Sequence, residues 1–134
     1  MTWLPDGNIL VALVLTDHAD HVRALSWFQG NTMTKFATCS VTQGTLLRLY
    51  LRLTTTPATP TGAWRILEHL EKDARHVFWN DGFSYLHVPS KNLQGQRQVT
   101  DAWLAELARR HGGKLATMDK GLAADQPDVA VLIP

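Results

Sequence analysis

The chain has 134 residues, of which 45% are hydrophobic and 19% are charged, and this composition suits one globular domain spanning residues 1–134. Its formal net charge of +1 excludes a protein that holds nucleic acid by overall basicity, so any such site must be local. The single cysteine, Cys39, excludes an intramolecular disulfide and a cysteine-rich zinc site. The apolar run at residues 9–15 is too short to span a bilayer and carries no signal-peptide pattern, so we expect a cytoplasmic protein without a membrane partner.

The first half of the chain predicts two strands and two helices around a buried apolar segment. In order, we expect a strand at 2–5, a buried segment at 9–15, a helix at about 17–28, a strand at 35–39, and a helix at 41–53 capped by Ser40. The spacing in the helix at 17–28 places Val22, Leu25 and Phe28 inward. Gln43 then lies in the first turn of the helix that follows the second strand.

The second half predicts further alternation of helices and strands. We expect a threonine- and proline-rich flexible loop at 54–62, a helix at 63–73, a strand at 76–79 and an exposed loop at 90–98. A helix capped by Thr100 follows and is stopped by Gly112 and Gly113, and after it we expect a strand at 114–118, a loop at 120–128 and a strand at 129–133. In the helix at 63–73, the period of 3.6 places Trp64, Leu67 and Leu70 inward.

This alternation predicts a three-layer α/β/α sandwich around a mainly parallel sheet with right-handed crossovers. Asp6 and Asp119 each follow a strand, and Asp101 begins a helix. In an open parallel sheet the carboxyl ends of the strands meet at the edge where ligands bind. We therefore expect these three aspartates to point at the same end of the sheet.

Three carboxylates at one edge repel each other unless a cation binds or one of them keeps a proton. Ligation by oxygen alone favours Mg²⁺ or Mn²⁺ over Zn²⁺, and the chemistry typical of such a site is phosphodiester cleavage by metal-activated water. Each residue also has an ordinary structural explanation. Asp6 suits a turn, Asp101 suits the positive end of a helix, and Asp119 suits a cap.

Three segments together resemble the PIN-domain nucleases, and among them the VapC-type toxins of bacterial toxin-antitoxin pairs. They read PDGNILVAL at 5–13, TCSVTQGTLLRL at 38–49 and QVTDAWLAELARRHGGKLATMDKGL at 98–122. The resemblance implies a PIN-like fold and a metal-dependent endoribonuclease that cuts tRNA or another structured RNA. It further implies silencing by a cognate VapB-type antitoxin and a homodimer.

The same resemblance implies roles for individual residues. The metal-binding acids are Asp6, Asp101 and Asp119, which would hold Mg²⁺ or Mn²⁺, and Asn8 and Thr117 are hydrogen-bonding positions that support them. Gln43 is a catalytic position in this pattern, where the family usually has a glutamate.

Gln43 leaves three interpretations open, because an amide keeps the acceptor oxygen of glutamate but cannot carry its charge. The glutamine is natural and the aspartates hold the metal alone, or it is an engineered change that blunts a toxic enzyme, or it marks a protein that has lost catalysis. We favour the first, since two carboxylates and water suffice for Mg²⁺. The alternative function is a catalytically silent PIN-like module that binds RNA or a protein.

Basic side chains beside the acids are candidates for RNA phosphate contacts, and Arg97 and Lys120 flank them in the sequence. His18 and His21 lie three residues apart, a spacing that can ligate metal, but without a third ligand we interpret them as exposed. A phosphatase is a weaker possibility, because Asn8 stands where an Asp-x-Asp pair needs its second acid.

Overall fold

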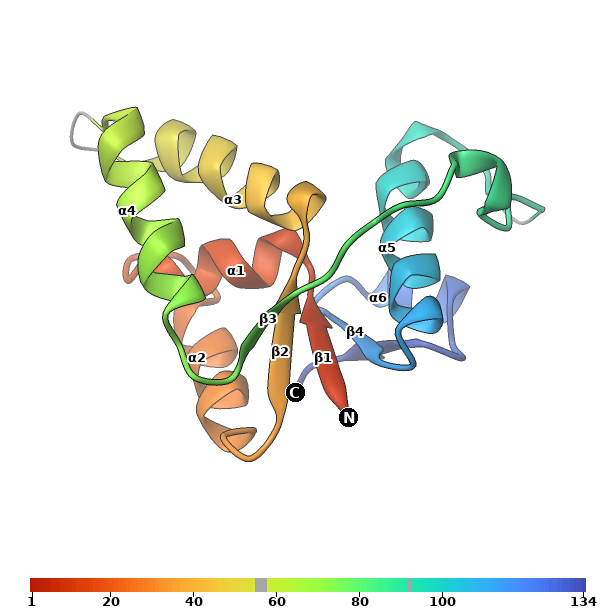
Figure 1. Cartoon of the computed structure of the whole chain (residues 1–134), viewed down its shortest axis with the longest axis horizontal. Helices are drawn as coiled ribbons and strands as arrows, with labels where there is room; N and C mark the ends of the chain where they lie inside the picture. The colour runs from red at the N-terminus through yellow and green to blue at the C-terminus, as the bar shows by residue number, and fades with distance from the viewer. Residues whose placement is uncertain (55–57, 92) are drawn as a thin grey trace.

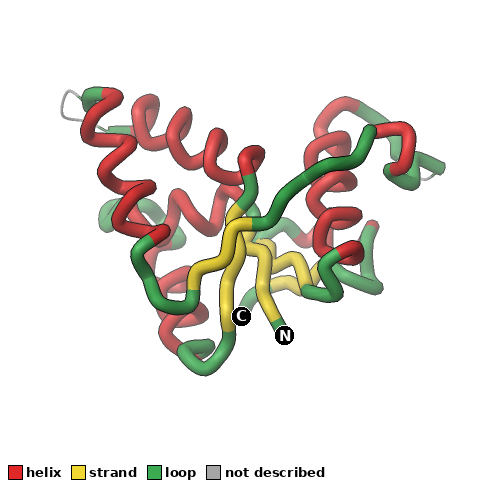
Figure 2. The backbone as a smooth tube through the Cα atoms, viewed as in Figure 1, coloured by secondary structure: helices red, strands yellow, loops and turns green. Residues whose placement is uncertain are grey.

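Five parallel strands form one sheet at the centre of the computed structural model, which describes residues 1–54, 58–91 and 93–134 (Figures 1 and 2). The strand order is β3-β2-β1-β4-β5, with β1 at Thr2–Pro5, β2 at Lys35–Thr38, β3 at His76–Phe78, β4 at Lys114–Thr117 and β5 at Ala130–Leu132. All four pairings are parallel. The predicted parallel sheet is confirmed.

Helices cover both faces of the sheet, as the sandwich prediction requires (Figure 1). One side holds α1 (Gly7–Val14), α2 (His21–Gly30), α3 (Ser40–Leu53) and α4 (Pro60–Glu71), and the other holds α5 (Val99–Arg110) and α6 (Lys120–Asp125). Two short 3₁₀ turns, η1 (Tyr85–His87) and η2 (Gln96–Gln98), lie in the long connection before α5.

The helix α5 packs through a broad apolar face made of Ala102, Trp103, Leu104, Ala105, Leu107 and Ala108, all buried. It ends at a glycine pair, as predicted. Gly112 adopts a φ of +65°, a left-handed conformation that favours glycine. A Cβ on Gly113 would lie 2.4 Å from the carbonyl oxygen of Thr2, so the missing side chain lets β4 enter the sheet beside β1.

Two inward assignments from helical spacing are wrong. Val22 is 74% exposed and Trp64 is 57% exposed. The helix α2 begins four residues later than predicted and packs through Ala24 and Trp27, whose ring meets Trp3 edge to face at 5.7 Å. In α4 the buried residue is Ala63. Each helix therefore buries an alanine, Ala24 in α2 and Ala63 in α4, which apolar periodicity alone does not single out.

Helix starts also differ from the sequence prediction. The predicted loop at 120–128 contains α6, whose six residues are too short for a periodic signal. The N-cap of α3 is Cys39 instead of Ser40, and the N-cap of α5 is Gln98 instead of Thr100, because η2 leads directly into that helix. In the predicted loop at 54–62, residues 55–57 lie outside the described residues and α4 already begins at Pro60.

Among the described residues, no helix has both the length and the apolar character needed to cross a membrane.

The close crossing of α1 and α3 gives a first prediction. A Cβ on Gly7 would lie 2.3 Å from Cγ2 and 2.6 Å from Cβ of Thr45, so Gly7→Ala forces the helices apart. We expect a loss of about 1–3 kcal/mol in the free energy of unfolding, measured by urea denaturation. Gly30→Ala is the matched control, because nothing lies within 4 Å of the place that its added Cβ would take, and it should be neutral or stabilising. Equal stability of the Gly7→Ala variant and the parent would contradict the tight crossing.

Candidate active site

Asp6 is a buried carboxylate at the end of β1, where it also caps α1. Its side chain is only 5% exposed, and Oδ1 accepts a hydrogen bond of 3.0 Å from the Ile9 amide. The other oxygen, Oδ2, accepts a bond of 2.6 Å from the Thr117 hydroxyl. Burial raises the pKa of Asp6 above its ordinary value, although these two donors favour the charged form.

Thr117 joins the ends of two neighbouring strands. The fully buried hydroxyl donates to Asp6 on β1 and accepts a bond of 3.0 Å from the Asp119 amide. Parallel pairing of β1 with β4 brings these residues together, because the Asp6 amide donates to the Ala116 carbonyl at 2.9 Å. The sequence placed Thr117 as a support for the acids, and it contacts two of them.

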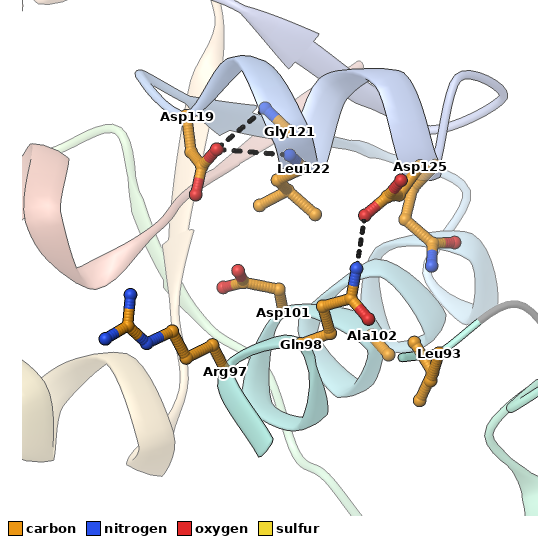
Figure 3. A pocket seen from close by; sticks show the side chains of 10 residues that line it. Leu93, Arg97, Gln98, Asp101, Ala102, Asp119, Gly121, Leu122 and Asp125 are labelled. Carbon is orange, nitrogen blue, oxygen red and sulfur yellow. Dashed lines mark hydrogen bonds between the residues drawn. The ribbon is translucent and has the colours of Figure 1, made fainter. Parts of the chain in front are cut away.

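Asp119 caps α6 with one oxygen. Oδ1 accepts bonds from the Gly121 amide at 2.8 Å and the Leu122 amide at 3.3 Å (Figure 3). The other carboxylate oxygen takes part in neither bond. Asp119 is exposed, so its carboxylate is open to a ligand while its orientation is set by the start of the helix.

Asp101 extends from the first turn of α5 into the same region, facing Asp119 (Figure 3). Burial raises its pKa to about 6, and repulsion from Asp6, Asp119 and Asp125 adds to this effect. The three predicted acids therefore interact through their charges at one end of the sheet. Asp125 is a fourth carboxylate in this field, and sequence reasoning missed it because it lies in the unpredicted helix α6.

A cavity of about 190 Å³ separates α5 from α6. Arg97 lines it beside Asp101 and Asp119, and Gln98 closes it by donating to Asp125 Oδ2 at 2.9 Å (Figure 3). The full lining is Leu93, Arg97, Gln98, Asp101, Ala102, Asp119, Gly121, Leu122, Asp125 and Gln126. Lys120, the other predicted RNA contact, is exposed at the first position of α6 and is not part of this lining.

A second cavity, of about 310 Å³, adjoins the acids, and we call it the His18 cavity. Its lining consists of Asp6, Asn8, His18, Asp20, Met118 and Asp119. Asp119 also lines the first cavity, so the two cavities meet at this residue. The interpretation of His18 as a plain exposed residue is wrong, because it is half-buried in this wall. The partner histidine, His21, instead contacts the Ala12 carbonyl at 2.7 Å.

Gln43 lies in the first turn of α3, as predicted, but its hydrogen bonds are to residues other than the acids. Its amide nitrogen donates to Thr38 Oγ1 at 2.9 Å and to Glu71 Oε1 at 3.1 Å. It lines neither of the two cavities that contain aspartates. In this conformation, the glutamine ties the start of α3 to the end of α4.

The side-chain conformations of the acids bear on cation binding. Within residues 1–54, 58–91 and 93–134, no three His, Cys, Asp or Glu side chains converge closely enough to hold one metal ion. Asp6 and Asp119 each direct an oxygen to backbone amides at a helix start, which turns part of each carboxylate toward its own chain. The three neighbouring carboxylates repel one another. A hard divalent cation prefers such oxygen ligands and would neutralise their charge.

The raised pKa of Asp101 predicts a pH-dependent stability. Between its ordinary value of 3.8 and about 6, the folded protein keeps a proton that the unfolded chain has released. This contribution is complete below the lower value and is lost as the pH rises through the upper one. We expect Asp101→Asn, which cannot ionise, to raise the free energy of unfolding in chelator by about 1 kcal/mol near neutral pH, after allowance for partial exposure.

Urea denaturation at acidic and neutral pH measures this difference. Asp17→Asn, at an exposed position, serves as the control, and its small effect on the free energy of unfolding should be the same at both pH values. If the gain in the free energy of unfolding caused by Asp101→Asn does not increase with pH, repulsion among the acids is weak.

Comparison with known proteins shows which family this chain resembles. The PIN domain model matches residues 4–125. Ribonuclease VapC29 of Mycobacterium tuberculosis is 46% identical over 134 residues, covering 100% of this chain and 98% of that protein. Ribonuclease VapC38 of the same species is 36% identical over 133 residues, covering 96% of this chain and 94% of that protein.

Solved structures agree with the fold. The crystal structure of VapBC2 from Rickettsia felis, bound to a DNA fragment from their promoter, matches with a TM-score of 0.66 at 14% identity and full coverage of both chains. FitAcB from Neisseria gonorrhoeae matches with a TM-score of 0.62 at 20% identity, covering 97% of this chain and 96% of that chain. From the full-length sequence similarity, this chain belongs to the PIN-domain family, in its VapC ribonuclease branch.

Proposed function

We propose that residues 1–134 form one PIN-like domain that acts as a metal-dependent endoribonuclease, the toxin of a type II toxin-antitoxin pair, cleaving tRNA or another structured RNA. Full-length similarity to Ribonuclease VapC29 supports the activity. The observation that carries the proposal is the linked set of acids. Thr117 bridges Asp6 and Asp119, and the charges of both add to the effect of burial in raising the pKa of Asp101.

In this proposal, Asp6, Asp101 and Asp119 hold Mg²⁺ or Mn²⁺. Their charges oppose one another at the same sheet edge, so a divalent cation relieves repulsion that the folded chain otherwise carries. Such an ion, when bound, supplies Lewis-acid activation of a water that attacks the RNA phosphate.

The other residues orient the acids and the substrate. Thr117 holds the Asp6 carboxylate through its hydroxyl, and Asn8 lines the adjoining His18 cavity from the first turn of α1. Arg97 lines the cavity that contains Asp101 and Asp119, which supports the proposal that it contacts a phosphate oxygen next to the cleaved bond. Lys120 follows Asp119 directly at the exposed start of α6, and we propose it as a second phosphate contact.

A silent binding module is the second candidate, and one observation favours it. Gln43 has the amide in place of the usual acid and directs it to Thr38 and Glu71. The fourth negative group that the family pattern supplies is therefore missing from the acids. Under the nuclease proposal, the three aspartates suffice, and Gln43 acts as a tether between α3 and α4.

A VapB-type antitoxin is the proposed protein partner, with a homodimer as the proposed state of the toxin. An apolar groove lies between α1, α2 and α4, away from the acids, with Leu13, Val14, Leu25, Phe28, His69, Leu70, Lys72 and Asp73 as its lining. An amphipathic helix fits such a groove. A basic side chain of the antitoxin, inserted among the acids, would neutralise them and block the metal.

Cleavage of a labelled tRNA pool tests the nuclease proposal. We expect cutting with Mg²⁺ or Mn²⁺, none with chelator, and a fall of at least about 100-fold in kcat/KM for Asp101→Asn. The Asp17→Asn control should cut as the parent does. Since Asp101→Asn is also expected to be more stable than the parent at neutral pH, lost activity cannot be assigned to unfolding. Full activity in the Asp101→Asn variant would refute the assignment.

Gln43→Glu separates the two candidate functions in the same assay. If three aspartates suffice, the parent cuts, and the variant loses stability because a second carboxylate faces Glu71. The double variant Gln43→Glu/Glu71→Gln removes this repulsion and should recover the lost stability. If neither the parent nor the variants cut while all bind RNA, the silent module is the correct function.

A further inference from the structure

The His18 cavity differs chemically from the rest of the candidate site. It touches the acids through Asp6 and Asp119, but the remaining lining is His18, Asp20, Asn8 and Met118. In the part of the chain that the structure describes, no Lys or Arg side chain lines this cavity, whereas Arg97 lines the cavity on the other side of Asp119. The two sides of the acids are therefore suited to different parts of a substrate.

The hydrogen bonding of His18 determines which ring nitrogen carries the proton. Nδ1 lies 3.0 Å from the Asp20 backbone nitrogen, whose N–H can only donate. Nδ1 must therefore be the acceptor, and the proton of the neutral imidazole lies on Nε2. His18, which lines the cavity, thus has an N–H donor available at Nε2, and the carboxylates in the same lining can act as acceptors.

A phosphate is a poor occupant of the His18 side of this cavity, because Asp20 adds a carboxylate there that is not among the proposed metal-binding acids, and no Lys or Arg side chain lines the cavity. A ribose 2′-hydroxyl is a good one, because it is neutral and both donates and accepts hydrogen bonds. Nε2–H of His18 and the Asn8 amide can donate to it, and the Asp20 carboxylate can accept from it. Met118 offers an apolar surface to the sugar ring.

We propose that the His18 cavity binds the ribose next to the cleaved phosphate, and that His18 and Asp20 select RNA over DNA by recognising its 2′-hydroxyl. The inference deepens the proposed function and rests on the acids being the site at which RNA is engaged. DNA entering the same cavity leaves the His18 donor and the Asp20 acceptor without a partner, and unpaired polar groups of this kind are the usual source of discrimination between such substrates.

Equilibrium binding in chelator tests this without depending on cleavage. The probes are fluorescein-labelled oligo(rU) and oligo(dU) of equal length, which differ only in the 2′-hydroxyl, and the readout is fluorescence anisotropy. We expect the parent to bind oligo(rU) about tenfold more tightly than oligo(dU), the effect of roughly one well-formed hydrogen bond. Equal affinities for the two probes, or binding of neither, would overturn the inference.

Two substitutions at His18 separate recognition from loop structure. His18→Asn keeps an acceptor near the Asp20 amide but loses the Nε2–H donor, so it should reduce the preference for oligo(rU) over oligo(dU). His18→Gln places an amide N–H at the distance of Nε2 and should retain much of the preference. His87→Asn, in the exposed turn η1, is the control and should leave the preference intact. An unchanged preference in His18→Asn would contradict the proposed contact.

The outcome distinguishes this inference from the nuclease proposal. RNA preference that depends on His18, without metal-dependent cutting of tRNA, leaves the ribose site standing and refutes the nuclease. Metal-dependent cutting of tRNA, combined with an RNA preference that does not depend on His18, supports the nuclease and refutes the ribose site. A 2′-O-methyl probe separates the partners further, because the ether oxygen still accepts from His18 but cannot donate to Asp20.

Discussion

A buried carboxylate at the end of β1 constrains the geometry of the candidate active site. Asp6 is almost without solvent, so its oxygens need donors, and these come from the Ile9 amide and the Thr117 hydroxyl. The first bond starts α1, and the second ties β1 to β4. Because Thr117 also accepts from the Asp119 amide, the position of one acid is coupled to that of another. The parallel pairing of two central strands therefore positions the candidate site.

In this arrangement, the carboxylates of the candidate site repel one another. Burial raises the pKa of Asp101, repulsion from the neighbouring carboxylates adds to this effect, and a cation at this edge would offset the repulsion. The surroundings of the acids are asymmetric, with Arg97 lining the cavity on one side and His18 lining the cavity on the other. This asymmetry suits a substrate that presents a phosphate on one side and a sugar on the other, and the apolar groove lies on a separate surface.

Patterns that depend on neighbours along the chain predicted the fold well. Alternating strands and helices gave the parallel sandwich, and the strand-end positions of Asp6 and Asp119 gave their proximity. The side that each helix buries also depends on its neighbours in space, and periodicity alone placed two residues wrongly. Val22 and Trp64 are exposed, whereas the buried residues are Ala24 and Trp27 in α2 and Ala63 in α4. The roles of the three acids, of Asn8 and of the basic residues remain predictions.

The sequence by itself determined the fold class, the family and the sheet edge at which the acids gather, because the alternation of strands and helices, apolar periodicity and motif spacing are local properties of the chain. Only the tertiary structure decided that Thr117 bridges two acids, that Gln43 turns to Glu71, and that His18 lines a cavity beside Asp6. These are contacts between side chains on different elements. Their geometry depends on how the helices pack against the sheet, which no short-range pattern records.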